Sequence, residues 1–353
     1  MAFGLPILDS APQRPVFAQG PRSLAAVKLL RISLTDRCNL RCLYCMPDEG
    51  VEFAPQDDVL SADHVIAVAT AARDAGVTHF KLTGGEPMLR PDLLDIVARI
   101  KALNPTELSM TTNGLGLGRG TRAADLAAAG LDRITVSLDA LDEPTFKRIS
   151  GSRGFTLANV WRGLDAAQAA GFGSGPRRIK LNVVMIGGIN GDQAADFAAL
   201  THRHPWTVRF IEYMPLGDSD LTRRGANTFT LDNAEVQAQI TAVHGPLIQI
   251  DRSDEPGVGP AQLYQLKGAI GKLGFISAMS QPFCETCNRL RLTATGELRA
   301  CLFDGGEVNL MPALSRPSGA NIAELRDLMA QCVAQKPDTH SGQGNRAMSQ
   351  LGG

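Results

Sequence analysis

The chain has 353 residues, with 35 Lys and Arg against 36 Asp and Glu, and hydrophobic residues make up 44% of it. This near balance of charge argues against a dedicated nucleic-acid-binding protein, because such proteins usually carry a basic excess. The apolar content is that of an ordinary folded core, which excludes a largely disordered chain.

The first 24 residues lack the charged start and apolar run of a secretory signal. No stretch elsewhere reaches the uninterrupted apolar length of a membrane helix. We therefore expect a cytoplasmic protein that binds neither membrane nor nucleic acid, with residues 1–24 as an N-terminal extension. Cytoplasmic thiols stay reduced, so clustered cysteines indicate metal ligands or catalysts rather than disulfides.

From residue 25 to residue 218, short apolar strands alternate with helical patterns. The predicted strands are residues 29–34, 79–83, 108–112, 133–138, 178–186 and 207–214, and the clearest helices are 62–76, 91–103 and 156–171. Such alternation predicts parallel βαβ units. Six units are too few to close an eightfold barrel, so we expect an α/β fold, an open partial (β/α)6 barrel of the TIM type. Polar or Gly-rich loops follow each strand, where barrel enzymes place their chemistry.

The pattern changes after residue 218. A polar region interrupted by Pro and Gly (250–262) leads to a second cysteine-containing segment, then to a helical pattern and a polar tail. We interpret residues 219–353 as a smaller C-terminal region that covers the open side of the barrel.

The first cysteine group follows the first predicted strand and consists of Cys38, Cys42 and Cys45. Three thiolates are one fewer than a tetrahedral zinc site or a fully protein-bound cubane requires. The missing ligand favours a [4Fe–4S] cluster with one iron open to a small molecule. A zinc site completed by His64 or His79 is the alternative, although neither histidine has a characteristic spacing.

The sequence TGGEP at residues 83–87 ends the next predicted strand. Gly84 and Gly85 allow a close approach of the backbone to a ligand. Glu86 offers an acceptor to a charged amino group.

The second cysteine group consists of Cys284, Cys287 and Cys301. Half of a zinc ribbon is the common meaning of C-x2-C, but no fourth ligand lies between residues 284 and 310, and a cluster with one open iron fits at least as well. Within the group, Arg289 and Arg291 stand at i and i+2 of a strand pattern, which points both to one side and suits phosphate binding.

The first cysteine group and GGEP resemble the signature of the radical S-adenosylmethionine (SAM) superfamily. The whole chain from about Leu29 to Gly353 resembles the GTP 3′,8-cyclases of molybdenum cofactor biosynthesis. The motifs that carry the second resemblance are CNLRCLYC, TGGEP, TTNG with VSLDALD, FIEYMPLG, CETCNRLR with ACLF, and the terminal MSQLGG. In that family the final Gly352–Gly353 tail threads into the active site.

The resemblance implies the ligands of each group. Two [4Fe–4S] clusters would be held by Cys38, Cys42 and Cys45 and by Cys284, Cys287 and Cys301. SAM would contact Tyr44, Gly85, Glu86, Ser137 and Met214. GTP would contact Arg31, Lys81, Thr111, Lys180, Arg289, Leu290 (through its backbone) and Arg291. The implied catalytic residues are the first three cysteines with Arg289 and Arg291. Position 81 departs from the family pattern, since many relatives carry Arg there and Lys lacks the bidentate fork.

The implied reaction begins with reductive cleavage of SAM to a 5′-deoxyadenosyl radical, which abstracts hydrogen from C3′ of GTP. Bond formation between C3′ and C8 then gives (8S)-3′,8-cyclo-7,8-dihydroguanosine 5′-triphosphate, so the enzyme would be a carbon–carbon lyase. The second cluster would hold the purine through its open iron. The resemblance also implies a homodimer, an electron donor of the flavodoxin or ferredoxin type, and a downstream cyclic pyranopterin monophosphate synthase.

Two other interpretations stay open at this point. One is another radical SAM enzyme with an auxiliary cluster, such as a peptide maturase, although those usually carry a more cysteine-rich C-terminal segment. The other is a non-catalytic iron–sulfur or zinc protein. Cys332 stands alone in a helical pattern and is most simply a buried small apolar residue.

Overall fold

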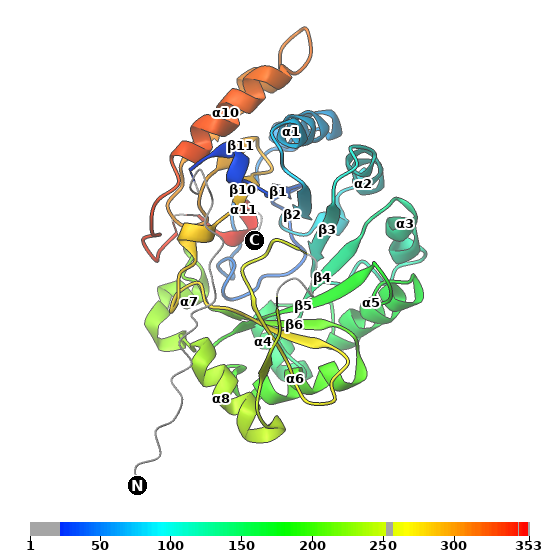
Figure 1. The fold of residues 1–353 in the computed structure, drawn as a ribbon, viewed down its shortest axis with the longest axis vertical. Coiled ribbons are helices and arrows are strands. Elements are labelled where there is room, and N and C mark those ends of the chain that lie inside the picture. Colours follow the sequence, from blue (N-terminus) through cyan, green and yellow to red (C-terminus); the bar gives the residue numbers. More distant parts are fainter. Residues whose placement is uncertain (1–21, 252–256, 345, 352–353) are drawn as a thin grey trace.

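The computed structural model describes residues 22–251, 257–344 and 346–351. Helices form an outer layer around a curved sheet (Figure 1). Most of the N-terminal extension and the final Gly352–Gly353 pair lie outside the described residues.

All six predicted strands are present, and they pair in parallel in chain order. They are β1 (Leu29–Ser33), β2 (His79–Thr83), β3 (Glu107–Thr112), β4 (Arg133–Ser137), β5 (Arg178–Met185) and β6 (Thr207–Glu212). Every residue of β2 is buried, as expected for a central parallel strand covered on both faces. The prediction of consecutive βαβ units is confirmed.

The chain continues this sheet at both edges with strands from the C-terminal region. β9 (Lys272–Ile276) pairs in parallel with β6, and β10 (Arg289–Leu292) pairs in parallel with β1. Antiparallel strands extend each edge: β8 (Gln262–Gln265) and β7 (Ile248–Gln249) beyond β9, and β11 (Glu297–Arg299) and β12 (Glu307–Asn309) beyond β10. Within the described residues the order runs from β12 to β7 without closing, so the barrel is open, as predicted.

The predicted helices correspond to α1, α2 and α5. The helices of the described chain are α1 (Ala62–Asp74), α2 (Leu93–Ala102), α3 (Arg122–Ala128), α4 (Glu143–Ser150), α5 (Leu157–Ala169), α6 (Ala194–Arg203), α7 (Asp220–Arg223), α8 (Asn233–His244), α9 (Met311–Leu314), α10 (Ile322–Ala334) and α11 (Met348–Leu351). Short 3-10 turns include η1 (Leu24–Ala26), η3 (Pro87–Leu89) and η7 (Cys284–Thr286).

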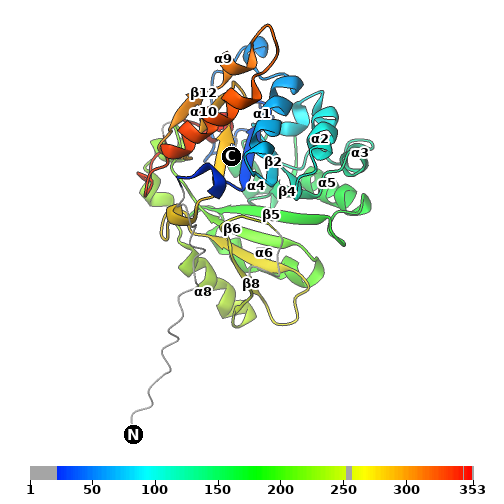
Figure 2. The ribbon, with the colours of Figure 1, turned by 45° about the horizontal axis from the view of Figure 1, so that its top comes forward.

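The main apolar core lies between the sheet and the outer helices. α1 buries Val65, Val68 and Ala72 against it, and the C-terminal α10 packs beside α1 (Figure 2). This packing leaves the polar side chains of the strands on the inner side of the curved sheet. No helix among the described residues combines the length and the apolar character that spanning a membrane requires.

Candidate active site

A cavity of about 310 Å³ lies inside the curved sheet, and both cysteine groups line it. Its wall includes inward-facing residues of β1 to β6 and β10, the loops that follow them, and Met348 of α11. Two cysteine groups that lie about 250 residues apart along the chain therefore meet at one enclosed space.

The loop that carries the first cysteine group is held by main-chain contacts. Arg41 and Leu43 donate their amides to the carbonyls of Ser150 and Ile149 at the end of α4, at 2.9 Å each. The Cys45 amide donates to the Cys42 carbonyl at 2.8 Å. These contacts fix the loop independently of any ligand.

The GGEP segment packs directly on this loop. A Cβ on Gly84, which has φ of +145°, would lie 2.5 Å from the Thr35 carbonyl oxygen, and a Cβ on Gly85 would lie 2.2 Å from that of Arg37. Both glycines are thus required by the approach of two backbone segments, in addition to any approach to a ligand. Gly85 also lines the cavity, as the sequence predicts for a ligand contact.

Glu86 is almost completely buried, and its carboxylate already has three donors within the protein. It accepts from the Met88 amide at 3.0 Å, from Thr112 Oγ1 at 2.7 Å and from the Asn113 amide at 2.7 Å. Burial nevertheless raises its pKa above the usual range. The carboxylate therefore braces the ends of two strand loops at the cavity wall, a structural use that the motif alone does not indicate.

The remaining residues predicted to contact SAM also line the cavity. Tyr44 donates its hydroxyl to Asp139 Oδ2 at 2.7 Å, and Asp139 Oδ1 accepts from the Val184 amide at 2.7 Å. Burial raises the pKa of Asp139 to about 6. Ser137 ends β4, and Met214 follows β6; both reach the same cavity.

The thiols of the first group are electrostatically difficult to ionise in the protein alone. Burial, and then the Glu86 carboxylate, raises the pKa of Cys38 to about 11. Burial, and then Cys45 and Cys38, raises the pKa of Cys42 well above its ordinary value. Three thiolates on one buried loop therefore need a cationic centre to hold them, which an iron–sulfur cluster supplies.

A single zinc ion and a cubane differ in how closely their ligands must gather. In the part of the chain that the structure describes, no three His, Cys, Asp or Glu side chains are grouped so as to bind one metal ion. A cubane instead takes each thiolate on a separate iron. Neither His64 nor His79 joins the cysteines, and His79 Nδ1 lies 2.8 Å from Thr78 Oγ1.

The second cysteine group lies among cations. Lys336, after α10, is buried and donates Nζ to the Cys287 carbonyl at 3.2 Å, to Cys287 Sγ at 3.4 Å and to the Arg289 carbonyl at 2.7 Å. Burial alone would raise the pKa of Cys287, but Arg289 and then Lys336 outweigh it and lower the pKa to about 6. This thiol is readily ionised, as a metal ligand must be.

The cations predicted to contact GTP stand in a row across the sheet. Arg31 of β1 is the register partner of Lys81 on β2 and of Arg291 on β10. Lys180 of β5 and Arg289 of β10 line the same cavity, as does Thr111 of β3. Leu290 is buried and is not among the lining residues, because its side chain points to the opposite face of β10.

Burial and mutual repulsion act on this row of cations. Burial, then Arg291 and Arg289, lowers the pKa of Arg31 well below its ordinary value. Burial and then Arg209 do the same to Lys81. Burial and then Arg289 lower the pKa of Arg291 to about 9. Such a concentration of buried positive charge is stabilised by a polyanionic ligand.

Two cavity arginines were missed by the sequence analysis. Arg209 stands in the middle of β6, and Arg133 begins β4, where it forms an ion pair with Glu107 at 2.5 Å. Arg209 and Ile211 stand at i and i+2 of β6 and both line the cavity, because such residues share one face of a strand; the sequence alone does not show which face that is. No sequence pattern distinguishes Arg133 from a surface arginine.

Two family models together match most of the chain. Residues 32–201 match the Radical SAM superfamily, and residues 206–342 match Molybdenum Cofactor Synthesis C. Among curated proteins, the GTP 3′,8-cyclase of Pelotomaculum thermopropionicum is 43% identical over 332 residues, which cover 93% of this chain and 98% of the relative. That of Heliobacterium modesticaldum is 41% identical over 337 residues, with coverage of 93% and 98%.

Solved structures share the fold at low sequence identity. Streptococcus suis SuiB bound to S-adenosylmethionine has a TM-score of 0.56 at 15% identity, and the match covers 93% of this chain and 78% of that one. Native anSMEcpe with bound AdoMet has a TM-score of 0.54 at 14% identity, with coverage of 90% and 82%. These likenesses concern the fold alone.

Proposed function

This chain belongs to the GTP 3′,8-cyclase family of radical SAM enzymes, and from that premise we propose how its cavity divides the work between two cysteine groups. Members of the superfamily bind SAM and a [4Fe–4S] cluster. In this chain the residues proposed to hold that cluster are Cys38, Cys42 and Cys45. Cys284, Cys287 and Cys301 would hold a second [4Fe–4S] cluster beside the purine of GTP.

The observation that carries this proposal is the single cavity that both cysteine groups and the row of cations share. A triphosphate carries about four negative charges near neutral pH, and buried cations bind such charge through strong charge-assisted hydrogen bonds. The residues assigned to the triphosphate are Arg31, Lys81, Lys180, Arg289 and Arg291. Arg209 lines the same cavity, and we add it to this set. They would hold the nucleotide with its ribose towards the first cysteine loop.

A [4Fe–4S] cluster held by Cys38, Cys42 and Cys45, together with SAM, would supply the one-electron chemistry for removal of the hydrogen atom from C3′ of GTP. The protein's part is orientation: held substrates react as if at very high effective concentration. Tyr44 is fixed by Asp139 at one side of the cavity, where we place the adenine of SAM. With both ligands bound, the strands that line the cavity would limit the access of water, which protects a radical from side reactions.

Two buried polar atoms would be satisfied by bound nucleosides. Thr111 Oγ1 of β3 and Asn182 Oδ1 of β5 have no hydrogen-bond partner among the described residues, and both residues line the cavity. A buried acceptor without a donor costs free energy, so a ligand hydroxyl or amine at either atom would recover it. This agrees with the assignment of Thr111 to GTP and adds Asn182 to the proposed site.

The peptide-maturase alternative has weaker support. The two solved structures described above match this chain at 14–15% identity, which concerns the fold alone, whereas curated GTP 3′,8-cyclases reach 43% over nearly the full length. The same family membership disfavours a non-catalytic zinc or iron–sulfur protein. The seven cysteines are all free thiols, which suits the reducing cytoplasm that we propose as its location.

Further aspects follow from the family resemblance alone. We propose a homodimer that receives electrons from a flavodoxin or ferredoxin and passes its product to a cyclic pyranopterin monophosphate synthase. The division into residues 25–218 and 219–353 would separate the part that makes the radical from the part that selects GTP.

Anaerobic incubation with GTP, SAM and dithionite, followed by mass analysis, tests the function. The expected products are 5′-deoxyadenosine and an isomer of GTP with altered ring absorbance. Iron analysis accompanies it, because two cubanes require about eight irons per chain. Cleavage of SAM without any change in GTP would contradict the substrate assignment.

A further inference from the structure

The C-terminal segment is packed tightly against the loop that leaves β6. Gly344 pairs with Leu216 in a parallel bridge, and the Gly217 amide donates to the Gly344 carbonyl at 2.9 Å. Gly217 has φ of +58°, and a Cβ there would lie 2.5 Å from the Ala347 amide nitrogen. In Figure 1, α11 (Met348–Leu351) lies near the centre of the view rather than at its outer edge.

The end of this segment reaches the first cysteine loop. The Met348 amide donates to the Cys45 carbonyl at 3.3 Å, and Met348 lines the cavity. Leu351 is completely buried. The segment 346–351 thus forms part of the cavity wall beside one of the proposed cluster ligands.

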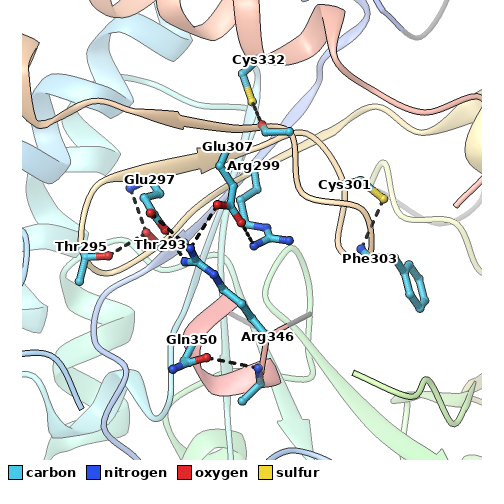
Figure 3. Close-up of polar contacts among 12 residues, drawn as sticks. Thr293, Thr295, Glu297, Arg299, Cys301, Phe303, Glu307, Cys332, Arg346 and Gln350 are labelled. Carbon is cyan, nitrogen blue, oxygen red and sulfur yellow. Dashed lines mark hydrogen bonds and ion pairs between the residues drawn. The ribbon is translucent and has the colours of Figure 1, made fainter. Parts of the chain in front are cut away.

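Arg346 attaches the same segment to the hairpin of β11 and β12, which lies next to the second cysteine group. Its guanidinium group forms an ion pair with Glu297 and donates Nη2 to Glu307 Oε2 at 3.1 Å (Figure 3). Glu297 begins β11 and Glu307 begins β12, so both carboxylates come from one hairpin. A guanidinium that bridges two carboxylates is held in direction as well as position.

The hairpin continues directly to a proposed ligand of the second cluster. Arg299 ends β11, is completely buried and forms an ion pair with Glu307. Cys301 follows two residues later. The two arginines and two glutamates balance in charge, and Arg299 keeps Glu307 in place even when Arg346 is absent.

We propose that Arg346 is a positioning residue for the cyclisation, because its two-carboxylate clamp fixes the C-terminal segment as a wall between the two cysteine groups. The segment touches Cys45 at one end, and the clamp joins it to the hairpin of Cys301 at the other. The proposal rests on the proposed function and deepens it. In this proposal, the clamp aligns GTP with the radical and takes no part in forming the radical.

The clamp is not expected to contribute much to the stability of the fold. Arg346, Glu297 and Glu307 are each about one-third exposed, and ion pairs of that kind contribute little to stability. Loss of the clamp should therefore leave the fold, the iron content and SAM cleavage unchanged. Only the fraction of cleaved SAM that leads to cyclised GTP should fall.

The test compares Arg346→Gln, Arg346→Lys and Glu297→Gln in the iron-loaded protein. The exposed pair Arg316–Glu324 provides the control Arg316→Gln. Product formed per 5′-deoxyadenosine should fall on the order of tenfold in Arg346→Gln, since misplacement of a held substrate by an ångström has effects of that size or larger. Glu297→Gln should act in the same direction, Arg346→Lys should keep part of the coupling, and the control should match the wild type.

The double variant Arg346→Gln with Glu297→Gln should be no worse than Arg346→Gln alone, because both remove one interaction. Hydrogen exchange supplies the readout that does not depend on turnover: the Met348 amide, bonded to Cys45, should exchange faster in Arg346→Gln. Unchanged exchange at Met348 would overturn the proposal, as would equal losses of SAM cleavage and product. If the wild type itself fails to cyclise GTP, the proposed function is wrong, while the exchange experiment still decides whether the clamp exists.

Discussion

The two cysteine groups face one cavity but lie in opposite electrostatic surroundings. The first lies near the carboxylates of Glu86 and Asp139, which, after burial, help to raise the pKa of Cys38 and Cys42 respectively. The second lies beside Arg289 and Lys336, which lower that of Cys287. A site rich in carboxylates suits the cationic sulfonium of SAM, and a site rich in cations suits a triphosphate. We propose that this difference in charge helps to direct SAM to the first cysteine group and GTP to the second.

The largest expected effects come from removal of one cysteine from each group, which tests whether the two groups have separate roles. Cys38→Ala should abolish 5′-deoxyadenosine formation and reduce iron from about eight to about four per chain, since one cubane is lost. Cys284→Ala should lose a similar amount of iron but retain SAM cleavage with dithionite. The matched control is Cys332→Ala, because Cys332 is buried, is not among the residues that line the cavity, and donates its thiol to the Gly306 carbonyl.

Undiminished formation of 5′-deoxyadenosine by Cys38→Ala would contradict the assignment of Cys38 as a ligand of the first cluster. Loss of SAM cleavage in Cys284→Ala would mean that the two groups do not act separately, and the division of labour would fail.

The row of cations offers a second test. Arg291→Gln should weaken GTP binding by up to about a hundredfold, which is the upper range for loss of a charged hydrogen bond. SAM binding, which we place at the other end of the cavity, should be unchanged. Equilibrium dialysis with each ligand measures both. Arg316→Gln serves again as the charge-matched control, and an equal loss of SAM affinity would contradict the sorting by charge.

The pKa contrast can be tested in protein stripped of iron. Cys287, with a pKa of about 6, is mostly thiolate at pH 7, whereas Cys38, with a pKa of about 11, is protonated. Iodoacetamide should label Cys287 faster by about fiftyfold, because the gain in thiolate is partly offset by lower nucleophilicity. The thiolate of Cys287 is lost as the pH falls through about 6, so its labelling rate should fall by on the order of tenfold between pH 7 and pH 5.

Peptide mass analysis of the alkylated sites gives the rates. Faster labelling of Cys38, or a Cys287 rate that does not decrease below pH 6, would show that the two environments are not as described.

The smallest expected effect concerns the reduction potential of the second cluster. Lys336→Met removes a cationic donor to Cys287 Sγ, and loss of such a hydrogen bond lowers cluster potentials by on the order of tens of millivolts. Lys336→Arg keeps the charge and is the control. Redox titration followed by EPR, in a Cys38→Ala background that contains only the second cluster, would detect the shift. An unchanged potential would limit Lys336 to bracing the loop through the two carbonyls.

The sequence predicted local structure well and long-range pairing poorly. The strand patterns predicted β1 to β6. The site residues assigned from the family resemblance, except Leu290, all line one cavity, because parallel βαβ units place successive loops at one rim. The return of the chain to both edges of the sheet was not predictable, since nothing local shows that Arg291 of β10 lies beside Arg31 of β1. The clamp was missed for the same reason: Arg346 meets Glu297 from 49 residues away.

The sequence also did not reveal which contacts individual side chains make in the folded chain. Glu86 was predicted as a ligand contact from its motif, but its three internal donors are visible only in the folded chain. Arg209 was not predicted although its strand was, because the strand pattern does not show which face of β6 borders the cavity. The roles assigned to individual residues towards SAM and GTP stay predictions.

The account's central claim is that one cavity brings the radical and the ribose of GTP together. GTP carrying deuterium at C3′, incubated anaerobically with SAM, dithionite and the iron-loaded protein, tests it most directly. The account predicts that 5′-deoxyadenosine gains one deuterium and that a cyclised nucleotide isomeric with GTP accumulates. Formation of 5′-deoxyadenosine without deuterium, at an undiminished rate in the presence of GTP, would contradict the claim.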